Sequence, residues 1–226
     1  MGLNWNSRDK FKREAELWDE DPRKRALAAA AGKAIIAHSE PLKNPLKTLN
    51  AFEFGCGTGL VSLEIAPLVT TLRAVDTSPE MLAVLQHKIR TAGVENIKTL
   101  SLDLLASGSP KDSGCDFGLI YGSMALHHIA DTSSFLEKLS DLLAPGGTVA
   151  IVDLEEEDGT FHDDPLEKVH HGFNRAKLAD MLKSAGLATI AFESVCTIEK
   201  ANRDGKKASY PVFIVTARKP EIVCPT

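Results

Sequence analysis

Apolar and polar residues alternate along the chain in blocks whose lengths predict a mixed α/β protein. Short apolar runs typical of buried strands lie at residues 49–54, 71–75, 97–102, 116–121, 148–154, 187–195 and 210–217. Between most of them, apolar residues recur at helical spacing, at residues 60–67, 79–90, 132–143 and 174–185. Ser78 followed by Pro79 is a typical helix start, and Pro145-Gly146-Gly147 is expected to end the third of these helices.

This order of elements predicts a Rossmann-like, doubly wound sheet of seven strands. Apolar strands separated by helices are typical of a mostly parallel sheet that is covered on both faces. Only the polar segment 199–207 separates the last two strands, so we expect an antiparallel C-terminal hairpin at one edge. The predicted organisation is an N-terminal helical cap at residues 1–46, one domain at residues 47–219 and a tail at residues 220–226. Within the cap, Pro22 suits a first helical turn, and Pro41 and Pro45 are expected to end the last helix.

Composition narrows the possible partners and the compartment. The 226 residues carry 26 Lys and Arg against 31 Asp and Glu, a net charge of −5, which argues against a nucleic-acid partner. No apolar run approaches the roughly 20 residues of a membrane span, so none is expected. The four cysteines are scattered without a C-x-x-C pair, which favours reduced thiols and a cytoplasmic location over a disulfide framework or a structural zinc site.

A glycine-rich turn follows the first predicted strand and precedes the first helix of the domain. Glycines in the stretch from Gly55 to Gly59 let the backbone turn sharply and let its N–H groups approach a ligand. Asp76 lies 21 residues beyond Gly55, at the end of the second strand, where a carboxylate can accept both hydroxyl protons of a ribose. The glycines read G-x-G-x-G rather than the dinucleotide pattern G-x-G-x-x-G, since Leu60 stands at the last position. The combination predicts a nucleoside-containing ligand.

Five stretches resemble the class I S-adenosylmethionine-dependent methyltransferases, and the resemblance covers residues 48–219. They are FEFGCGTG at 52–59, AVDTSPEML at 74–82, LDLL at 102–105, DFGLIYGSMALHHI at 116–129 and LAPGGTVAIVDL at 143–154. The chain is most similar to small-molecule methyltransferases of ubiquinone and menaquinone biosynthesis. The resemblance implies S-adenosyl-L-methionine as cofactor, S-adenosyl-L-homocysteine as product and a small-molecule methyl acceptor.

The resemblance also implies roles for residues at the carboxyl ends of the strands. Glu53 is expected to hold the amino group of the cofactor, and Asp76 the ribose hydroxyls. The methionine portion would lie along the glycine turn, the adenine near residues of the second and third strands, and the sulfonium near the end of the fourth. The cofactor-binding residues expected on this basis are Glu53, Gly55, Cys56, Gly57, Gly59, Asp76, Thr77, Met81, Asp103, Leu104, Tyr121 and Gly122.

Catalytic candidates must follow the fourth or fifth strand to face the cofactor. His127 and His128 do so, and an imidazole of near-neutral pKa suits removal of a proton from a phenol, enol or thiol. An alternative is that they only pack against the next helix or face solvent. Residues 153–173 form an acidic, histidine-rich segment, interpreted as a lid over the acceptor, with metal binding disfavoured because no ligand pair has helical spacing. Substrate-contact candidates are Trp18, Ser123, His170 and His171.

The sequence therefore predicts a metal-independent methyltransferase that acts on a small molecule by O-, C- or S-methylation. A catalytically silent methyltransferase-like scaffold remains a rival hypothesis. An NAD(P)-dependent oxidoreductase is disfavoured by the glycine spacing and by the antiparallel hairpin. A macromolecular acceptor is disfavoured by the acidity of the chain and by the lack of an added binding region.

Overall fold

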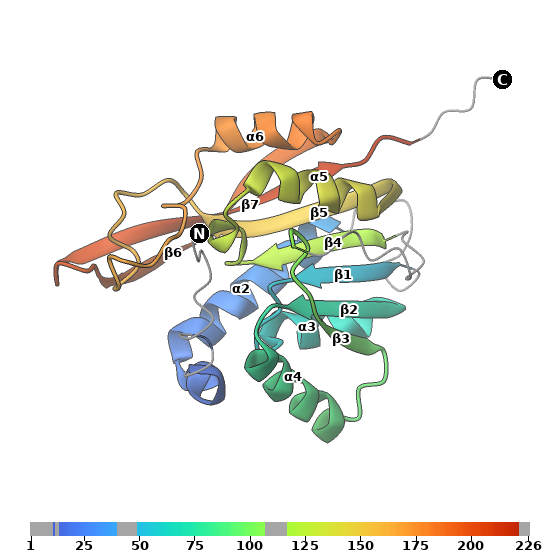
Figure 1. Cartoon of the computed structure of the whole chain (residues 1–226), viewed down its shortest axis with the longest axis horizontal. Helices are drawn as coiled ribbons and strands as arrows, with labels where there is room; N and C mark the ends of the chain where they lie inside the picture. Colours follow the sequence, from blue (N-terminus) through green and yellow to red (C-terminus); the bar gives the residue numbers. More distant parts are fainter. Residues whose placement is uncertain (1–10, 12–13, 40–48, 107–116, 222–226) are drawn as a thin grey trace.

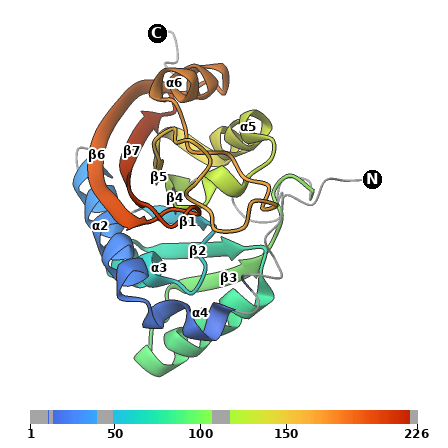
Figure 2. The same ribbon diagram turned by 90° about the vertical axis from the view of Figure 1, so that its left-hand side faces the viewer.

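The structure, a computed structural model, describes residues 11, 14–39, 49–106 and 117–221. A seven-stranded sheet in the order β3-β2-β1-β4-β5-β7-β6 forms its centre (Figures 1 and 2). The strands are β1 (Asn50–Phe54), β2 (Thr71–Asp76), β3 (Ile97–Ser101), β4 (Phe117–Ser123), β5 (Leu143–Leu154), β6 (Ala188–Ala201) and β7 (Lys207–Arg218). Neighbouring strands among β1 to β5 pair in parallel, whereas β7 is antiparallel to both β5 and β6. The predicted architecture and the C-terminal hairpin are confirmed.

The helices cover both faces of the sheet, as the apolar strands require. They are η1 (Ala15–Glu20), α2 (Pro22–Ser39), α3 (Leu60–Ile65), η3 (Ala66–Leu68), α4 (Pro79–Ala92), η4 (Leu126–His128), α5 (Thr132–Leu142) and α6 (Arg175–Ser184). Residues of α2, α3 and α4 share one buried cluster with Ala51 and Leu72 of the sheet. Residues of α5 and α6 share the other with Phe52 and Phe54. Because Ala51 and Phe52 are neighbours on one strand, they point to opposite faces, as the period of a strand requires.

Several predicted boundaries differ from the structure. Helix α2 begins at Pro22 as predicted, but Asp21 separates it from the preceding 3₁₀ turn. Strand β5 already starts at Leu143, ahead of the Pro-Gly-Gly sequence, and its pairing with β4 shifts register between Phe117 and Leu119 to accommodate it. The linker with Pro41 and Pro45, the predicted domain boundary at residue 46 and most of the tail lie outside the described residues.

The last hairpin is longer than its sequence indicated. The predicted connection 199–207 was wrong, since β6 continues to Ala201, β7 starts at Lys207 and only residues 202–206 form the turn. Backbone pairing such as Glu199 with Ser209 extends the ladder beyond the rest of the sheet (Figure 1). The hairpin remains polar there because its side chains alternate between exposed and half-buried positions, so the sequence pattern resembles that of a loop.

The strand order places a ligand site at one edge of the sheet. The chain runs from β1 outwards to β3 and then returns to β4 on the other side of β1. In open α/β sheets, ligands bind outside the carboxyl ends of the strands at such a reversal. Among the described residues, no helix is both long and apolar enough to cross a membrane.

Candidate functional site

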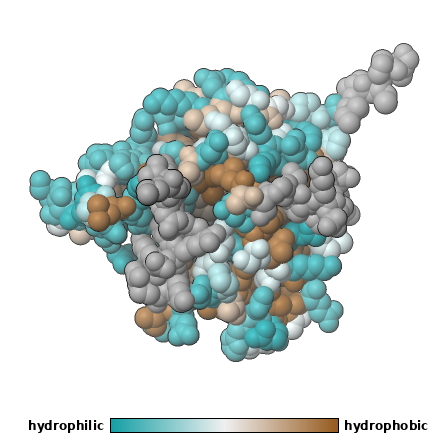
Figure 3. Space-filling view, viewed as in Figure 1, coloured by the Kyte–Doolittle hydropathy of each residue, from teal (hydrophilic) through white to brown (hydrophobic). Residues whose placement is uncertain are grey.

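A cavity of about 1010 Å³ lies at the carboxyl ends of β1, β2 and β4. Its lining combines two groups of residues: the glycine turn with the ends of β2 and β3, and a wall formed by η4, the N-terminal segment, the loop after β5 and the β6–β7 hairpin. In the space-filling view, hydrophobic residues gather near the middle of the face that is shown, with hydrophilic residues around much of them (Figure 3). The cavity is large enough for a nucleoside-containing ligand together with a small second molecule.

The glycine turn between β1 and α3 requires its glycines. Gly55, Gly57 and Gly59 have φ angles of 62°, 53° and 79°, which side chains rarely adopt. A Cβ at Gly55 would lie 2.4 Å from the Ala125 side chain, so the turn packs directly against the segment after β4. Gly55, Cys56 and Gly57 line the cavity. Gly59 does not line the cavity. Glycine is favoured at this position because a Cβ would lie 2.2 Å from the Leu85 side chain.

Asp76 connects the end of β2 to the glycine turn. Its two carboxylate oxygens accept the backbone N–H groups of Gly57 and Ser78, each at 2.8 Å. Burial raises the pKa of Asp76, while the hydrogen bonds from Ser78, Gly57 and Thr77 oppose this shift. The carboxylate lines the cavity, in the position predicted for ribose binding.

Glu53 lies beneath the glycine turn and is 2% exposed. Its Oε2 accepts the hydroxyl groups of Ser62 at 2.5 Å and Tyr121 at 3.1 Å. Burial raises the pKa of Glu53 to about 8, although these two hydrogen bonds lower it. At pH 7 the Glu53 carboxyl is therefore mostly protonated in the free protein.

The other cofactor candidates divide into two sets. Those that line the cavity are Thr77, Met81, Asp103 and Leu104. Asp103 also accepts the N–H groups of Leu105 and Ala106, so it holds a turn as well. Tyr121 and Gly122 do not line it. Tyr121 is fully buried beside Glu53, and a Cβ at Gly122 would lie 2.4 Å from the Phe54 ring.

The N-terminal segment forms one wall of the cavity. Trp18, which the sequence analysis proposed as a substrate contact, lines the cavity, and the Lys24 ammonium lies 3.3 Å from the centre of its ring. Asp19 fixes this wall, because its carboxylate accepts hydrogen bonds from Thr58 of the glycine turn and Lys88 of α4, both at 2.6 Å. This contact of Asp19 across the site was missed from the sequence.

His127 is held by a buried acid. Its ring Nδ1 lies 2.6 Å from Oδ1 of Asp153, which is fully buried at the end of β5, and its backbone N–H donates to Oδ2 of the same carboxylate. A carboxylate only accepts hydrogen bonds, so Nδ1 carries the proton and Nε2 is the nitrogen with the available lone pair. Both His127 and His128 line the cavity, together with Ser123.

The loop after β5 contributes different residues from those predicted. Phe161 and His162 line the cavity, whereas His170 and His171 do not. His170 instead anchors the loop, since its backbone N–H donates to the His127 carbonyl and its ring lies 2.9 Å from the Ile129 carbonyl. The hairpin residues Ile198, Lys200 and Asn202 also line the cavity and were missed. Ile198 lies beyond the end of the predicted strand, and the other two lie in the segment 199–207 that was interpreted as a connection.

Comparisons with known proteins agree with this geometry. A family model described as a methyltransferase domain matches residues 52–149. An uncharacterized methyltransferase of Schizosaccharomyces pombe is 31% identical over 152 residues, which cover 62% of this chain and 54% of that protein. A ubiquinone biosynthesis O-methyltransferase of Caulobacter sp. is 28% identical over 152 residues, 66% of this chain and 57% of that protein. Among solved structures, the chain is similar to the N-methyltransferase NodS of Bradyrhizobium japonicum in complex with S-adenosyl-L-homocysteine. The TM-score is 0.63 at 18% identity, and the match covers 96% of this chain and 100% of the NodS chain.

The sheet order and the glycine turn after β1 define a Rossmann-like fold, which the similarity to NodS supports. The methyltransferase-domain match and the relatives named methyltransferases support the resemblance to class I S-adenosylmethionine-dependent methyltransferases that was seen in the sequence. The chain spans about half the length of the curated relatives that it matches.

Replacing Asp76 tests the ribose assignment. Asp76→Ala removes the carboxylate that is expected to accept the two ribose hydroxyls, so S-adenosyl-L-homocysteine should bind at least tenfold more weakly, a loss of about 1.4 kcal/mol or more. Isothermal titration calorimetry measures the affinity. Asp180→Ala, an exposed change on α6, is the control and should bind like the wild type. Wild-type affinity in a folded Asp76→Ala variant would contradict the assignment.

The raised pKa of Glu53 predicts that cofactor binding releases a proton. At pH 7 the carboxyl is mostly protonated, since its pKa is about 8, and the positive amino group of a bound S-adenosyl-L-homocysteine should ionise it. Calorimetry at pH 7 in buffers of different ionisation enthalpy counts the protons. Glu53→Gln keeps an acceptor for Ser62 and Tyr121 but cannot ionise, so it should release fewer protons. Equal release by both proteins would exclude Glu53 as the source.

Proposed function

We propose that this protein transfers the methyl group of S-adenosyl-L-methionine to a small-molecule acceptor through oxygen, carbon or sulfur. The observation that carries the proposal is that one cavity contains both the glycine turn with Asp76 and a wall with His127 and His128. A ligand bound along the glycine turn would therefore face an acceptor bound against the histidines. The domain at residues 47–219 would bind the cofactor, and the N-terminal segment would cap it.

The residues of the glycine-turn side fit this cofactor chemically. Asp76 offers a carboxylate for a ribose diol, and Glu53 offers an ionisable carboxyl for an amino group. Met81 and Leu104 are nearly fully buried apolar side chains at the cavity, suited to a purine ring. When bound, S-adenosyl-L-methionine supplies a methyl group that is already activated by the sulfonium charge.

The protein's contribution is then mainly alignment, which can provide about 7–11 kcal/mol of a barrier. Asp153 fixes the ring of His127, and the Nε2 lone pair activates an acceptor that arrives protonated. Acceptors with a phenol, enol or thiol group match this requirement. The rings of Phe11, Trp18 and Phe161 on the same wall favour an acceptor with an apolar or aromatic body.

Two rival functions make different predictions. A silent scaffold would bind the cofactor without turnover, and the buried Asp153–His127 pair beside the cofactor side favours an enzyme instead. An oxidoreductase would bind a nicotinamide cofactor, which the G-x-G-x-G spacing and the methyltransferase family both disfavour. We also propose a cytoplasmic location, with which the free thiols of Cys56 and Cys196 agree.

Parallel calorimetric titrations test the cofactor class. The full chain should bind S-adenosyl-L-methionine and S-adenosyl-L-homocysteine and should not bind NADH. Binding of both sulfur compounds would then justify a screen of phenols, quinols and thiols for methyl transfer. Binding of NADH alone would overturn the proposed function, and binding of the sulfur compounds with no turnover across the screen would favour the scaffold.

A change at His127 separates activation of the acceptor from cofactor binding. His127→Ala removes the Nε2 lone pair but leaves Asp76 and the glycine turn in place, so kcat should fall at least a hundredfold while the affinity for S-adenosyl-L-homocysteine stays within about twofold. His87→Ala, on the exposed face of α4, is the matched control. Equal losses of turnover and affinity would assign His127 a structural role.

A further inference from the structure

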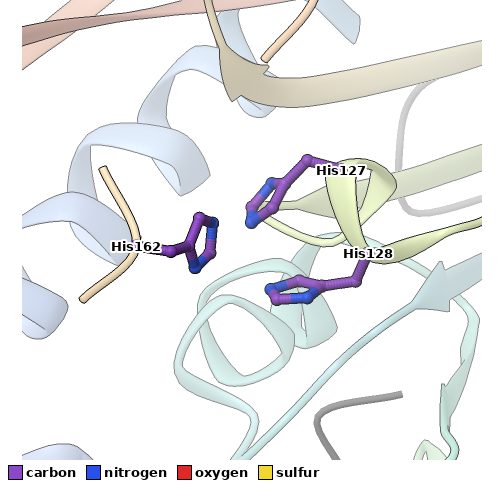
Figure 4. Close-up of side chains that lie close together, drawn as sticks. All are labelled: His127, His128 and His162. Carbon is purple, nitrogen blue, oxygen red and sulfur yellow. The ribbon is translucent and has the colours of Figure 1, made fainter. Parts of the chain in front are cut away.

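Three histidine side chains from two separate segments converge on one wall of the cavity. His127 and His128 come from η4, and His162 comes from the loop after β5 (Figure 4). Each offers one ring nitrogen, and these atoms all lie within 4.8 Å of one another. The ring centres of His127 and His162 are 5.2 Å apart, so the rings face a common point between the two segments.

Buried carboxylates orient two of these rings in the same way. His127 Nδ1 lies 2.6 Å from Asp153, and His162 Nδ1 lies 3.2 Å from Glu167. The side chains of these acids are 0% and 6% exposed, so both pairs are shielded from water. A histidine that donates from one ring nitrogen to a carboxylate while the other nitrogen faces inward is the typical arrangement behind a protein-bound metal ion.

His162 provides an independent sign that a ligand is missing. Its side chain is only 9% exposed, and its Nε2 is buried without a hydrogen-bond partner among the described residues. A buried polar atom without a partner costs about 1–3 kcal/mol, so such atoms are rare in native proteins. A cation bound at this nitrogen would remove the cost.

We propose that His127, His128 and His162 bind a divalent transition-metal ion, with Zn²⁺ as the ion that best fits three neutral imidazoles. Zn²⁺ binds histidine nitrogen at about 2.0–2.1 Å, which places the nitrogens of a tetrahedral site roughly 3.3 Å apart. The three ring nitrogens now lie within 4.8 Å of one another. Small rotations of the rings about χ2, which cost little energy, would bring them to this spacing. Three protein ligands leave one tetrahedral position open, as in catalytic rather than structural zinc sites.

The open position would face the cavity that all three histidines line. This step rests on the proposed function: the ion would bind the oxygen or sulfur of the acceptor and lower its pKa, so that its proton leaves to solvent at neutral pH. The resulting anion forms a bond to the methyl carbon as the carbon–sulfur bond breaks and a neutral thioether leaves. The ion changes no oxidation state. The inference replaces the sequence-based expectation of a metal-free site. With the ion bound, Nε2 of His127 is a metal ligand, so the ion takes over the activation of the acceptor that the proposed function assigns to that lone pair.

Zinc titration of the full chain, stripped with a chelator, tests the site without any acceptor. Wild-type protein should bind one Zn²⁺ and melt at a higher temperature in its presence. His162→Ala should bind Zn²⁺ at least tenfold more weakly, whereas His87→Ala should match the wild type. Equal zinc affinity in the wild type and His162→Ala would overturn the proposal.

Two further measurements keep the proposal testable if the His162→Ala variant does not fold. Glu167→Gln keeps the His162 ligand and removes the carboxylate behind it, so zinc affinity should fall about 10- to 100-fold. Co²⁺ in place of Zn²⁺ should give the intense visible absorption of a tetrahedral site in the wild type and lose it in either variant. A weak octahedral spectrum in the wild type would contradict the three-histidine geometry.

Binding of S-adenosyl-L-homocysteine to the same samples separates this inference from the proposed function. The metal variants should keep wild-type affinity, since neither residue belongs to the glycine-turn side. Cofactor binding without zinc binding would overturn the metal site alone. Zinc binding without cofactor binding would overturn the proposed function and leave the metal site standing.

Discussion

The carboxylate of Asp153 is the constraint on which the acceptor side of the site depends. One buried side chain accepts the backbone N–H of His127, the ring of the same residue and the backbone N–H of Leu154. It therefore fixes η4 against the end of β5 and sets which nitrogen of His127 is available. The His127 carbonyl in turn accepts the N–H of His170, so the loop that carries His162 is anchored to the same short turn. Asp153 thus fixes both the backbone position of His127 and the ring nitrogen that faces the cavity.

On the cofactor side, by contrast, the burial of an acidic side chain, Glu53, lowers the stability of the free protein at neutral pH. Glu53 has a folded-state pKa of about 8, above its ordinary value of 4.5, so between these values the folded state binds more protons than the unfolded state. Its contribution to stability is therefore present at low pH and is lost as the pH rises towards 8. A structure selected for stability alone would place an apolar residue there. The acid is understandable if a cation has to be bound beside it.

Local sequence patterns predicted the fold and the glycine turn with Asp76 beside it, because both depend on short-range rules. Apolar runs set the strands, and glycines with positive φ set the turn at Gly55 to Gly59. Asp76 could be identified as a candidate because it lies at the end of a predicted strand. The acceptor side depends on tertiary contacts instead. The loop 155–173 has no helix or strand pattern, and its course is set by a bridge between Glu155 and Phe173 and by Lys200, which donates to the Phe161 carbonyl. Sequence alone therefore selected His170 and His171 rather than His162.

These anchors bear on how the acceptor side operates. The sequence interpretation was a mobile lid, whereas the structure ties the loop to η4 through His170, to the hairpin through Lys200 and to β5 through Phe173. A loop held at three places positions His162 before any ligand arrives, and a preorganised ligand set is what both acceptor alignment and ion binding require. The N-terminal wall is tied in a similar way, because Asp19, the neighbour of Trp18, accepts hydrogen bonds from Thr58 of the glycine turn and from Lys88 of α4. Both walls are therefore positioned before a ligand arrives, one through the glycine turn and the other through η4 and the hairpin.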